Sequence, residues 1–489
     1  MSLSPTVLPV AAVEEKAKLA WAGKDLWSTL RFLAVPAALA MAIILFGIKL
    51  PGWALYGFGG AIGVTLFAHT LRDPEWLLAC ATIYLPLNMM FVVPLGFGMN
   101  ATNMVLLLLL FSCFRNRSLE PTAMSGDSPA RLPGTVLVST YAGVTLMSVV
   151  TSIVTLGPDF VLDRILDVKG WLDQFIVFFT FLRLIRNGNM ARRMMVYIML
   201  SATVVVVLGF QEWLEKRGAS SMEKARLLGP QIQPNDFGAF LAYASTPFLA
   251  LLLANLGKLR AWLVAAPYPG ISARILLATF SRGAYLGMGL AAIVATYLRG
   301  KVFIVVVAIL GFTLVTIEPE LVPKSMRDRM AQTSSSSSGG EELDRSAQTR
   351  LILWDAALKM TTESPIFGWG FKSFPKFKGQ FTTTEVEEAD NHNMYLYLSS
   401  QMGIPAVLLL GLILWRMYSL GSRIYRGGRD GFTRTIGMAA AALAGAALLV
   451  NMFGSRMVDI CVTSHFWIIL AMVSRLSTEI QAQQEMESA

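Results

Sequence analysis

The chain has 489 residues, of which 54% are hydrophobic and only 15% are charged, and its mean hydropathy is +0.55. Soluble globular domains carry about 25% charged residues, so this composition excludes an ordinary soluble domain and indicates a chain largely embedded in lipid. The formal charge of +9 would suit nucleic acid in a soluble protein, but in a membrane protein it usually reports cytoplasmic loops. We therefore expect no nucleic-acid partner.

The candidate metal and cofactor chemistry is sparse. Cys80, Cys113 and Cys461 lie in or beside apolar runs, with no C-x-x-C pair, and we interpret them as small packing residues. Metalloprotease, Walker-type and Asp-x-Asp motifs are not found. The sequence therefore predicts chemistry without a metal ion or another cofactor.

Apolar runs of roughly membrane-crossing length recur along the chain and predict an all-α, polytopic membrane protein with about 12 to 14 spans. The first run is expected to be a span rather than a cleavable signal peptide, because about thirty residues precede it and no small-residue cleavage site follows. The runs lie near 31–49, 53–69, 76–94, 99–114, 134–154, 171–186, 194–211, 236–256, 259–280, 284–298, 302–318, 394–415, 435–453 and 460–475.

Lys and Arg collect in alternate loops, which predicts that those loops and both termini face the cytoplasm. The opposite, outer face then receives three segments, 155–170, 213–235 and 319–391. The expected organisation is a cytoplasmic tail over 1–30, a transmembrane bundle over 31–318, a large outer loop over 319–391, C-terminal transmembrane helices over 392–476 and a cytoplasmic tail over 477–489.

The long outer loop contains a flexible low-complexity tract at 334–340 and then a helical pattern. The pattern predicts an amphipathic helix on the membrane surface, ending at a tight Gly-rich turn. It is formed by Arg350, Leu351, Trp354, Ala357 and Leu358. Asp390 and Asn391 supply N-cap chemistry before the run at 394, so His392 is expected at the outer mouth of a transmembrane helix.

Four polar features of the outer face are not explained by topology alone. They are Arg226 ahead of Asn235, Ser281 with Arg282 in a short turn, Arg350 with Trp354, and Asn391, His392 and Asn393 with Tyr395. A guanidinium group binds phosphate oxygens in a bidentate manner and stays charged at low dielectric, which suits a lipid diphosphate. Histidine can take a proton from a hydroxyl nucleophile. The competing interpretation is structural, with arginines that reach toward lipid headgroups and a histidine that caps a helix.

Other polar residues favour a structural interpretation. His69 is expected at the membrane interface, and His465 in the last span is expected to form a hydrogen bond between helices. Arg456 and Asp459, three residues apart, are expected to pair with each other and fix packing. The acidic stretch 385–390 either raises the pKa of the histidine that follows it or is simply solvated.

Taken in order, these features resemble the O-antigen ligase and O-antigen polymerase superfamily of bacterial inner-membrane glycosyltransferases. The resemblance covers about residues 226–415, where five short segments occur in the right order. These are Arg226 through Asn235-Asp236-Phe237-Gly238, the run FSRGAYL at 280–286, Arg350-x-x-x-Trp354, the run SPIFGWG at 364–370, and HNMYL at 392–396 leading to Gly403-Ile404-Pro405.

The resemblance implies a GT-C-like fold and metal-independent transfer of a glycan from an undecaprenyl-diphosphate carrier to an acceptor hydroxyl, at the periplasmic face of the inner membrane. It implies that Arg226 and Arg282 bind the donor diphosphate, with Arg350 a further candidate, and that His392 activates or orients the acceptor. Supporting roles would fall to Asn235, Ser281, Trp354, Gly368, Gly370, Asn391, Asn393 and Tyr395. Arg164 and Lys169 are additional candidates for positive charge near the donor.

The sequence leaves the acceptor open, so both a ligase and a polysaccharide polymerase fit, with a glycan, lipid or protein hydroxyl as acceptor. Membrane lipids and other polysaccharide-assembly proteins are the remaining expected partners. A transporter or flippase is an alternative, although it predicts internal repeats and paired broken helices that we do not find. A non-catalytic assembly partner is another, and it would tolerate the loss of His392.

Overall fold

A computed structural model describes residues 68, 74–91, 100–115, 132–219, 221–303, 305, 341–382 and 386–488. Apart from Ala68, these residues belong to one compact unit, 69–489. The regular elements among them are α-helices and short 3-10 helices, which confirms the predicted all-α class. The expected spans at 31–49, 53–69 and 302–318, the tract at 334–340 and His69 lie wholly or largely outside the described residues.

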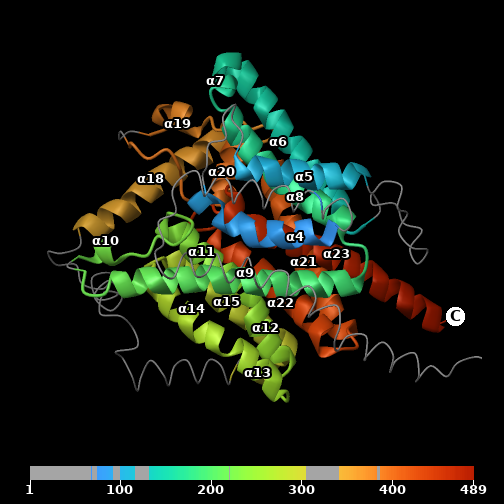
Figure 1. The fold of residues 1–489 in the computed structure, drawn as a ribbon. Helices are drawn as coiled ribbons and strands as arrows, with labels where there is room; N and C mark the ends of the chain where they lie inside the picture. The colour runs from blue at the N-terminus through green and yellow to red at the C-terminus, as the bar shows by residue number, and fades with distance from the viewer. Residues whose placement is uncertain are drawn as a thin grey trace, which may run out of the picture. The chain divides into compact units, whose positions relative to one another are not determined.

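Seven helical segments of the described chain are long and apolar enough to cross a membrane, so the protein is polytopic (Figure 1). They are α6 (Thr135–Leu156), α9 (Gly188–Glu215), α11 and α12 (Pro234–Ala244 and Thr246–Ala254), α13 and α14 (Leu259–Ala265 and Pro267–Ala278), α21 (Ile404–Gly427), α22 (Gly431–Val450) and the part of α23 (Ile460–Ser488) up to Ala482. The bundle also contains α4 (Pro74–Tyr84), a 3-10 turn (Leu85–Phe91), α5 (Ala101–Arg115), α7 (Pro158–Leu162), α8 (Ile165–Leu184) and α15 (Arg282–Arg299).

The remaining elements connect these helices. They are α10 (Met222–Ala225), α18 (Glu341–Glu363), α19 (Phe374–Phe377), a 3-10 turn (Lys378–Gln380) and α20 (Met394–Met402). The prediction of one continuous span over 394–415 is wrong. Gly403, at φ +82°, ends α20, and α21 begins at Ile404 with Pro405 in its first turn, a position that suits proline.

Small residues allow the central helices to pack closely. The α-carbon of Gly287 in α15 faces Val450 of α22, and Gly421 of α21 faces the backbone of Gly437 in α22. A side chain at any of these glycines would collide with the neighbouring helix. Close approach through glycine and alanine is typical of helix packing in membranes, and it places α22 between α15 and α21.

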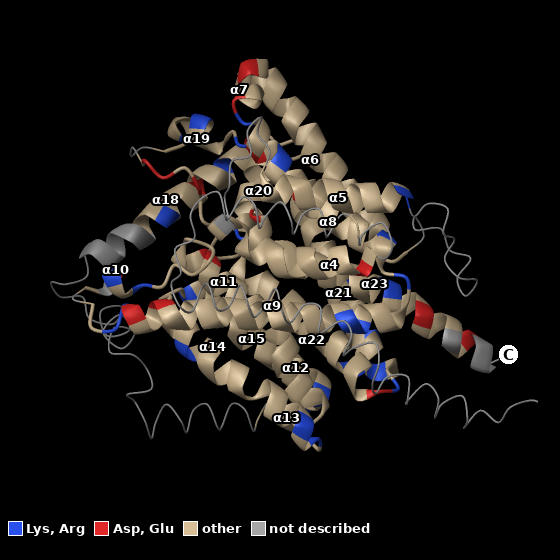
Figure 2. Ribbon diagram, viewed as in Figure 1, with Lys and Arg blue, Asp and Glu red and all other residues tan. Residues whose placement is uncertain are grey.

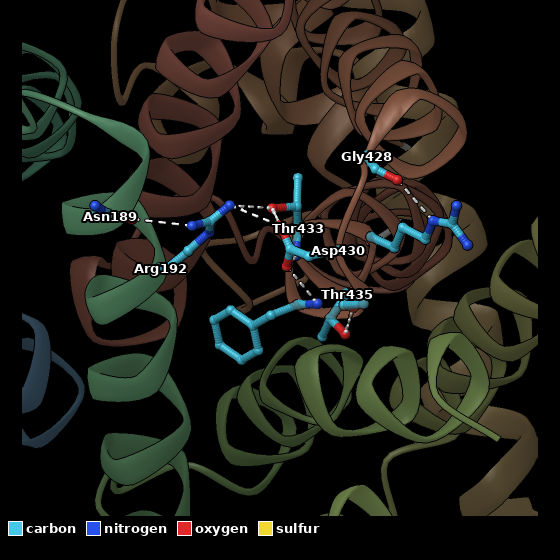
Figure 3. Close-up of polar contacts among 9 residues, drawn as sticks. Asn189, Arg192, Gly428, Asp430, Thr433 and Thr435 are labelled. Carbon is cyan, nitrogen blue, oxygen red and sulfur yellow. Dashed lines mark hydrogen bonds and ion pairs between the residues drawn. The ribbon is translucent and has the colours of Figure 1, made fainter. Parts of the chain in front are cut away.

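A polar network joins α9 to the turn before α22 at one end of the bundle (Figure 3). Asp430 caps α22 by accepting from the backbone of Thr433 at 2.9 Å, and Arg192 Nη2 donates to Asp430 Oδ2 at 2.7 Å. Asn255, near the basic loop 258–260, donates to Thr435 of the same helix at 3.1 Å. Several loops that were predicted to share one face therefore lie together at this end, and Figure 2 shows basic residues at α13 and at the start of α9. Its cytoplasmic assignment stays a prediction.

The helix predicted in the long loop is present as α18, and its apolar residues lie on two faces. Its predicted position on the membrane surface stays a prediction. Leu351 and Leu358 are 61% and 53% exposed. Buried residues instead lie at 353, 356, 357 and 360 and pack with Phe374, because this is the face that α18 turns toward α20. Thr361 Oγ1 adds a hydrogen bond of 2.9 Å to Ser399 of α20.

Candidate active site

His392 lies in a short loop that is held in place on both sides. The indole of Trp354 in α18 donates to the carbonyl oxygen of Asn391 at 2.8 Å. Asn391 Oδ1 accepts from the backbone of Asn393 at 3.1 Å, and Asn393 Oδ1 caps α20 by accepting from Tyr395 N at 3.0 Å. The expectation that Asp390 and Asn391 cap this helix is therefore wrong, because Asn393 is the residue in an extended conformation directly before the first turn.

His392 itself adopts a left-handed backbone conformation, with φ +53°, which is rare for a residue with a side chain. Its ring is 30% exposed, and Nδ1 lies 3.6 Å from Asp390 Oδ2. The other oxygen of Asp390 accepts from Ser455 Oγ at 2.8 Å. Ser455, in the connection between α22 and α23, therefore holds this carboxylate in place. A strained residue beside an oriented carboxylate is a frequent feature of functional sites.

Burial lowers the pKa of His392 below its ordinary value. The charge of Asp390 raises it, while Arg350 and Arg456 lower it further. The net direction is downward, so the imidazole is largely neutral at neutral pH and able to accept a proton. The acidic stretch thus acts on the histidine, chiefly through Asp390, but burial and the arginines outweigh it.

Arg350 lies within electrostatic range of three other arginines, and two of these four arginines, Arg350 and Arg456, also act on His392. Burial lowers the pKa of Arg350, and the positive charges of Arg282, Arg456 and Arg226 lower it further, in that order. Asp390 opposes them. The three predicted arginines and His392, which are separated by up to 166 residues of sequence, are therefore brought together as one cationic cluster.

Different elements position the predicted arginines. Arg226 donates through Nε to the carbonyl of Thr279 at 3.2 Å and through Nη2 to Asn235 Oδ1 at 3.3 Å, so Asn235 and the turn before α15 orient it. Arg282 is exposed at the first position of α15, after buried Ser281. Neither Arg282 nor Arg350 forms an ion pair with a described residue. Their guanidinium groups can therefore accept an anionic ligand.

Sequence reasoning missed the fourth arginine. Arg456 Nη1 pairs with Asp236 Oδ1 across 220 residues, so the expected pairing with Asp459 is wrong. Both side chains of this ion pair are shielded, at 9% and 14% exposure. One feature of the sequence could have indicated this ion pair. Asp236 directly follows Asn235, in a segment that the sequence analysis had already selected. A buried arginine needs a buried acid, and helix spacing alone cannot identify that partner.

Some predicted supporting residues serve the scaffold at a distance from the cluster. Gly368, at φ +66°, lies against Gln401 at the C-terminal end of α20, and Gly370, at φ +105°, lies against Ser152 of α6. There the backbone of Trp369 donates to Ser400 O at 3.0 Å and that of Gly370 donates to Gln401 O at 2.9 Å. These contacts cover the C-terminal carbonyls of α20.

Other predicted residues have local partners. The hydroxyl of Tyr395 donates to Leu448 O at 2.7 Å and ties α20 to α22. Arg164 stacks on Phe160, and Lys169 pairs with Asp173 at 2.5 Å. His465 bonds Thr82 O at 3.2 Å, which confirms its predicted link between helices. The three cysteines are free thiols.

Fold and site together define an all-α, polytopic membrane protein with an arginine cluster beside a neutral histidine. Residues 270–411 match the family model described as O-antigen ligase, so this part of the chain is similar to that family. The match supports O-antigen ligase-like glycan transfer in general terms. It contains Arg282, Arg350 and His392 but not Arg226 or Arg456. No curated protein matches the chain.

Proposed function

We propose that the protein is a glycosyltransferase that moves a glycan from an undecaprenyl-diphosphate carrier to an acceptor hydroxyl at the periplasmic face of the bacterial inner membrane. The observation that carries this proposal is the like-charged cluster of Arg226, Arg282, Arg350 and Arg456 next to His392. Such a cluster is unfavourable when empty, because each positive charge disfavours the others. A diphosphate would compensate that charge.

The proposed reaction needs a leaving group and a proton acceptor. The acceptor oxygen forms a bond to the anomeric carbon, the bond from that carbon to the diphosphate oxygen breaks, and undecaprenyl diphosphate leaves with the bonding electrons. Negative charge grows on the diphosphate during this step, and preorganised guanidinium groups stabilise it. The lowered pKa of His392 leaves its ring neutral, so it can take the hydroxyl proton.

Asp390 has a positioning role in this scheme. Its carboxylate is held by Ser455 and lies 3.6 Å from His392 Nδ1, so it favours the tautomer with the proton on Nδ1 and leaves Nε2 as the acceptor. Asp236 in turn neutralises Arg456, which leaves Arg282 and Arg350 as the groups without an acidic partner among the described residues. We assign those two arginines, with Arg226, to the donor diphosphate.

The test is transfer in a deletion strain complemented with wild type or with His392→Ala. We expect the variant to insert and fold but to lose transfer, because removing a general base costs about 10²-fold or more. Single repeats left on the carrier or on a lipid core would identify a polymerase, and long carrier-linked chains without a capped acceptor would identify a ligase. Normal polysaccharide from the folded variant would overturn the proposal and favour a transporter or a non-catalytic partner.

Arg282→Lys is the companion variant for the donor site. A lysine keeps the charge but lacks the planar fork, so we expect weaker donor binding and incomplete activity. The product pattern and the level of inserted protein would be measured side by side with wild type. Full activity would show that the site needs only a charge at this position and would contradict bidentate phosphate binding.

A further inference from the structure

A basic hollow of about 410 Å³ lies at the ends of α9 and α14 that are nearest the arginine cluster. Trp213 in the last turn of α9, and Lys216 and Arg217 directly after that helix, line the hollow. Arg274 of α14 lines it as well. Ala278 and Phe280, on the turn into α15, form part of its wall. None of the polar residues of this hollow takes part in the proposed transfer.

The hollow carries uncompensated positive charge. Lys216 is neutralised by Glu212, with which it forms an ion pair of 2.7 Å. Arg217 and Arg274 instead share one aromatic ring, since their guanidinium carbons lie 4.0 and 5.0 Å from the ring centroid of Trp213. Neither arginine forms an ion pair with a described residue. Two cations held over one indole leave their outer N–H groups for an anion.

The position of the hollow favours an anion carried by a lipid. Two segments of membrane-crossing length, α9 and α13 together with α14, end at the hollow. Tryptophan is enriched at that depth, where lipid phosphates are found. Leu214 and Ile271, which neighbour the hollow in sequence, are 44% and 41% exposed and suit contact with lipid chains. Arg274 lies one helical turn before the end of α14, so it can reach toward a headgroup from the apolar side.

The hollow shares a wall with the arginine cluster. Lys216 Nζ donates to the carbonyl of Arg226 at 2.6 Å, and the backbone of Leu227 donates to Ala278 O at 3.2 Å. The next carbonyl, that of Thr279, accepts from the Arg226 side chain. A single stretch of backbone therefore separates the two groups of cations, and an occupant of the hollow would lie beside the donor site.

We propose that Arg217 and Arg274, stacked on Trp213, form a second phosphate site that holds the headgroup of a membrane lipid. The ligand class is a lipid phosphate, and its chain would run along the exposed apolar surface of α9 and α14. The site is independent of glycan transfer, so it can be tested without an activity assay.

The experiment is native mass spectrometry of the purified full chain in detergent, titrated separately with phosphatidylglycerol, polyprenyl monophosphate and diacylglycerol. The variant is Arg217→Gln with Arg274→Gln. The matched control is Arg299→Gln with Lys301→Gln, which also removes two exposed cations. The control site likewise has a cation over an aromatic ring, since the guanidinium carbon of Arg299 lies 5.3 Å from the ring centroid of Phe303. Arg274→Gln alone provides a milder variant should the double variant fold poorly.

We expect wild type and the control to retain one phosphate-bearing lipid that the double variant binds about tenfold or more weakly, and the single variant to lie between them. Diacylglycerol should not bind in this way. A preference between the two phosphate lipids would identify whether a phospholipid or the carrier occupies the site. Equal lipid binding by all proteins would overturn the proposal, and so would displacement of the lipid by millimolar inorganic phosphate.

Discussion

The hydrogen bond from Trp354 to the loop of His392 allows the positioning of the histidine to be separated from general stability. Trp354→Phe keeps an aromatic ring in place but removes the indole N–H that donates to Asn391 O at 2.8 Å. Trp369→Phe removes an equivalent donor, because the indole of Trp369 bonds Met360 O at 2.9 Å on the same α18. Each buried hydrogen bond contributes about 1 kcal/mol to stability, so both variants should unfold at similar, slightly lower temperatures.

Only one of these variants should lose activity. If the hydrogen bond of Trp354 contributes this 1 kcal/mol by ordering the loop of His392, removing the bond raises the activation free energy by a similar amount. That increase corresponds to about a fivefold lower rate. We therefore expect Trp354→Phe to transfer glycan about fivefold more slowly, with little change in donor affinity, and Trp369→Phe to stay close to wild type. Equal rates in the two variants, measured on purified protein with a lipid-linked donor, would refute this account of the loop.

Two further variants test the charge at the site and the turn behind it. Asp390→Asn removes the negative charge that raises the pKa of His392, so the ring should stay neutral to lower pH. The acidic limb of the pH–rate profile should therefore shift to lower pH. A limb that does not shift in the folded variant would contradict the contact between Asp390 and His392. Gly368→Ala combines φ +66° with a methyl group only 2.5 Å from Met402 N, so we expect a loss of about 1–3 kcal/mol in stability. Thermal unfolding would measure it against Gly379→Ala, which has open space around it; equal effects would show that the contact is unimportant.

Much of this arrangement could be predicted from the chain alone, because its signals are local. Apolar runs predicted most of the described helices, and Pro267 inside the run at 259–280 is where α14 begins. Arg226 and Arg282 could be predicted as a pair because each lies in a short motif at a helix end, Arg226 directly after α10 and Arg282 as the first residue of α15. Helix ends on one side of a bundle converge, so their polar residues meet.

What the sequence could not supply depended on distant packing. Arg456 has an acid three residues away, and spacing alone favours that neighbour over Asp236, which is 220 residues distant. The face of α18 that packs on α20 could not be predicted for a similar reason. Leu351 and Leu353 are equally apolar, and only the position of α20 decides that Leu353 is buried. Neither the acidic partner of Arg456 nor the buried face of α18 can be deduced from residues within one helical turn.

The contacts behind α20 set limits on how the protein can be recombined with relatives. The nine residues of α20 rise only about 14 Å, too little to cross a bilayer core of about 30 Å. Its last carbonyls are covered by the backbone of Trp369 and Gly370, and Ile404 N returns a bond of 2.8 Å to Pro365 O. A chimaera that exchanges the long loop before α20 to alter the acceptor should therefore carry 364–404 as one cassette. A junction placed between the turn and α20 would pair a foreign turn with native carbonyls, in surroundings where water cannot replace the missing donors.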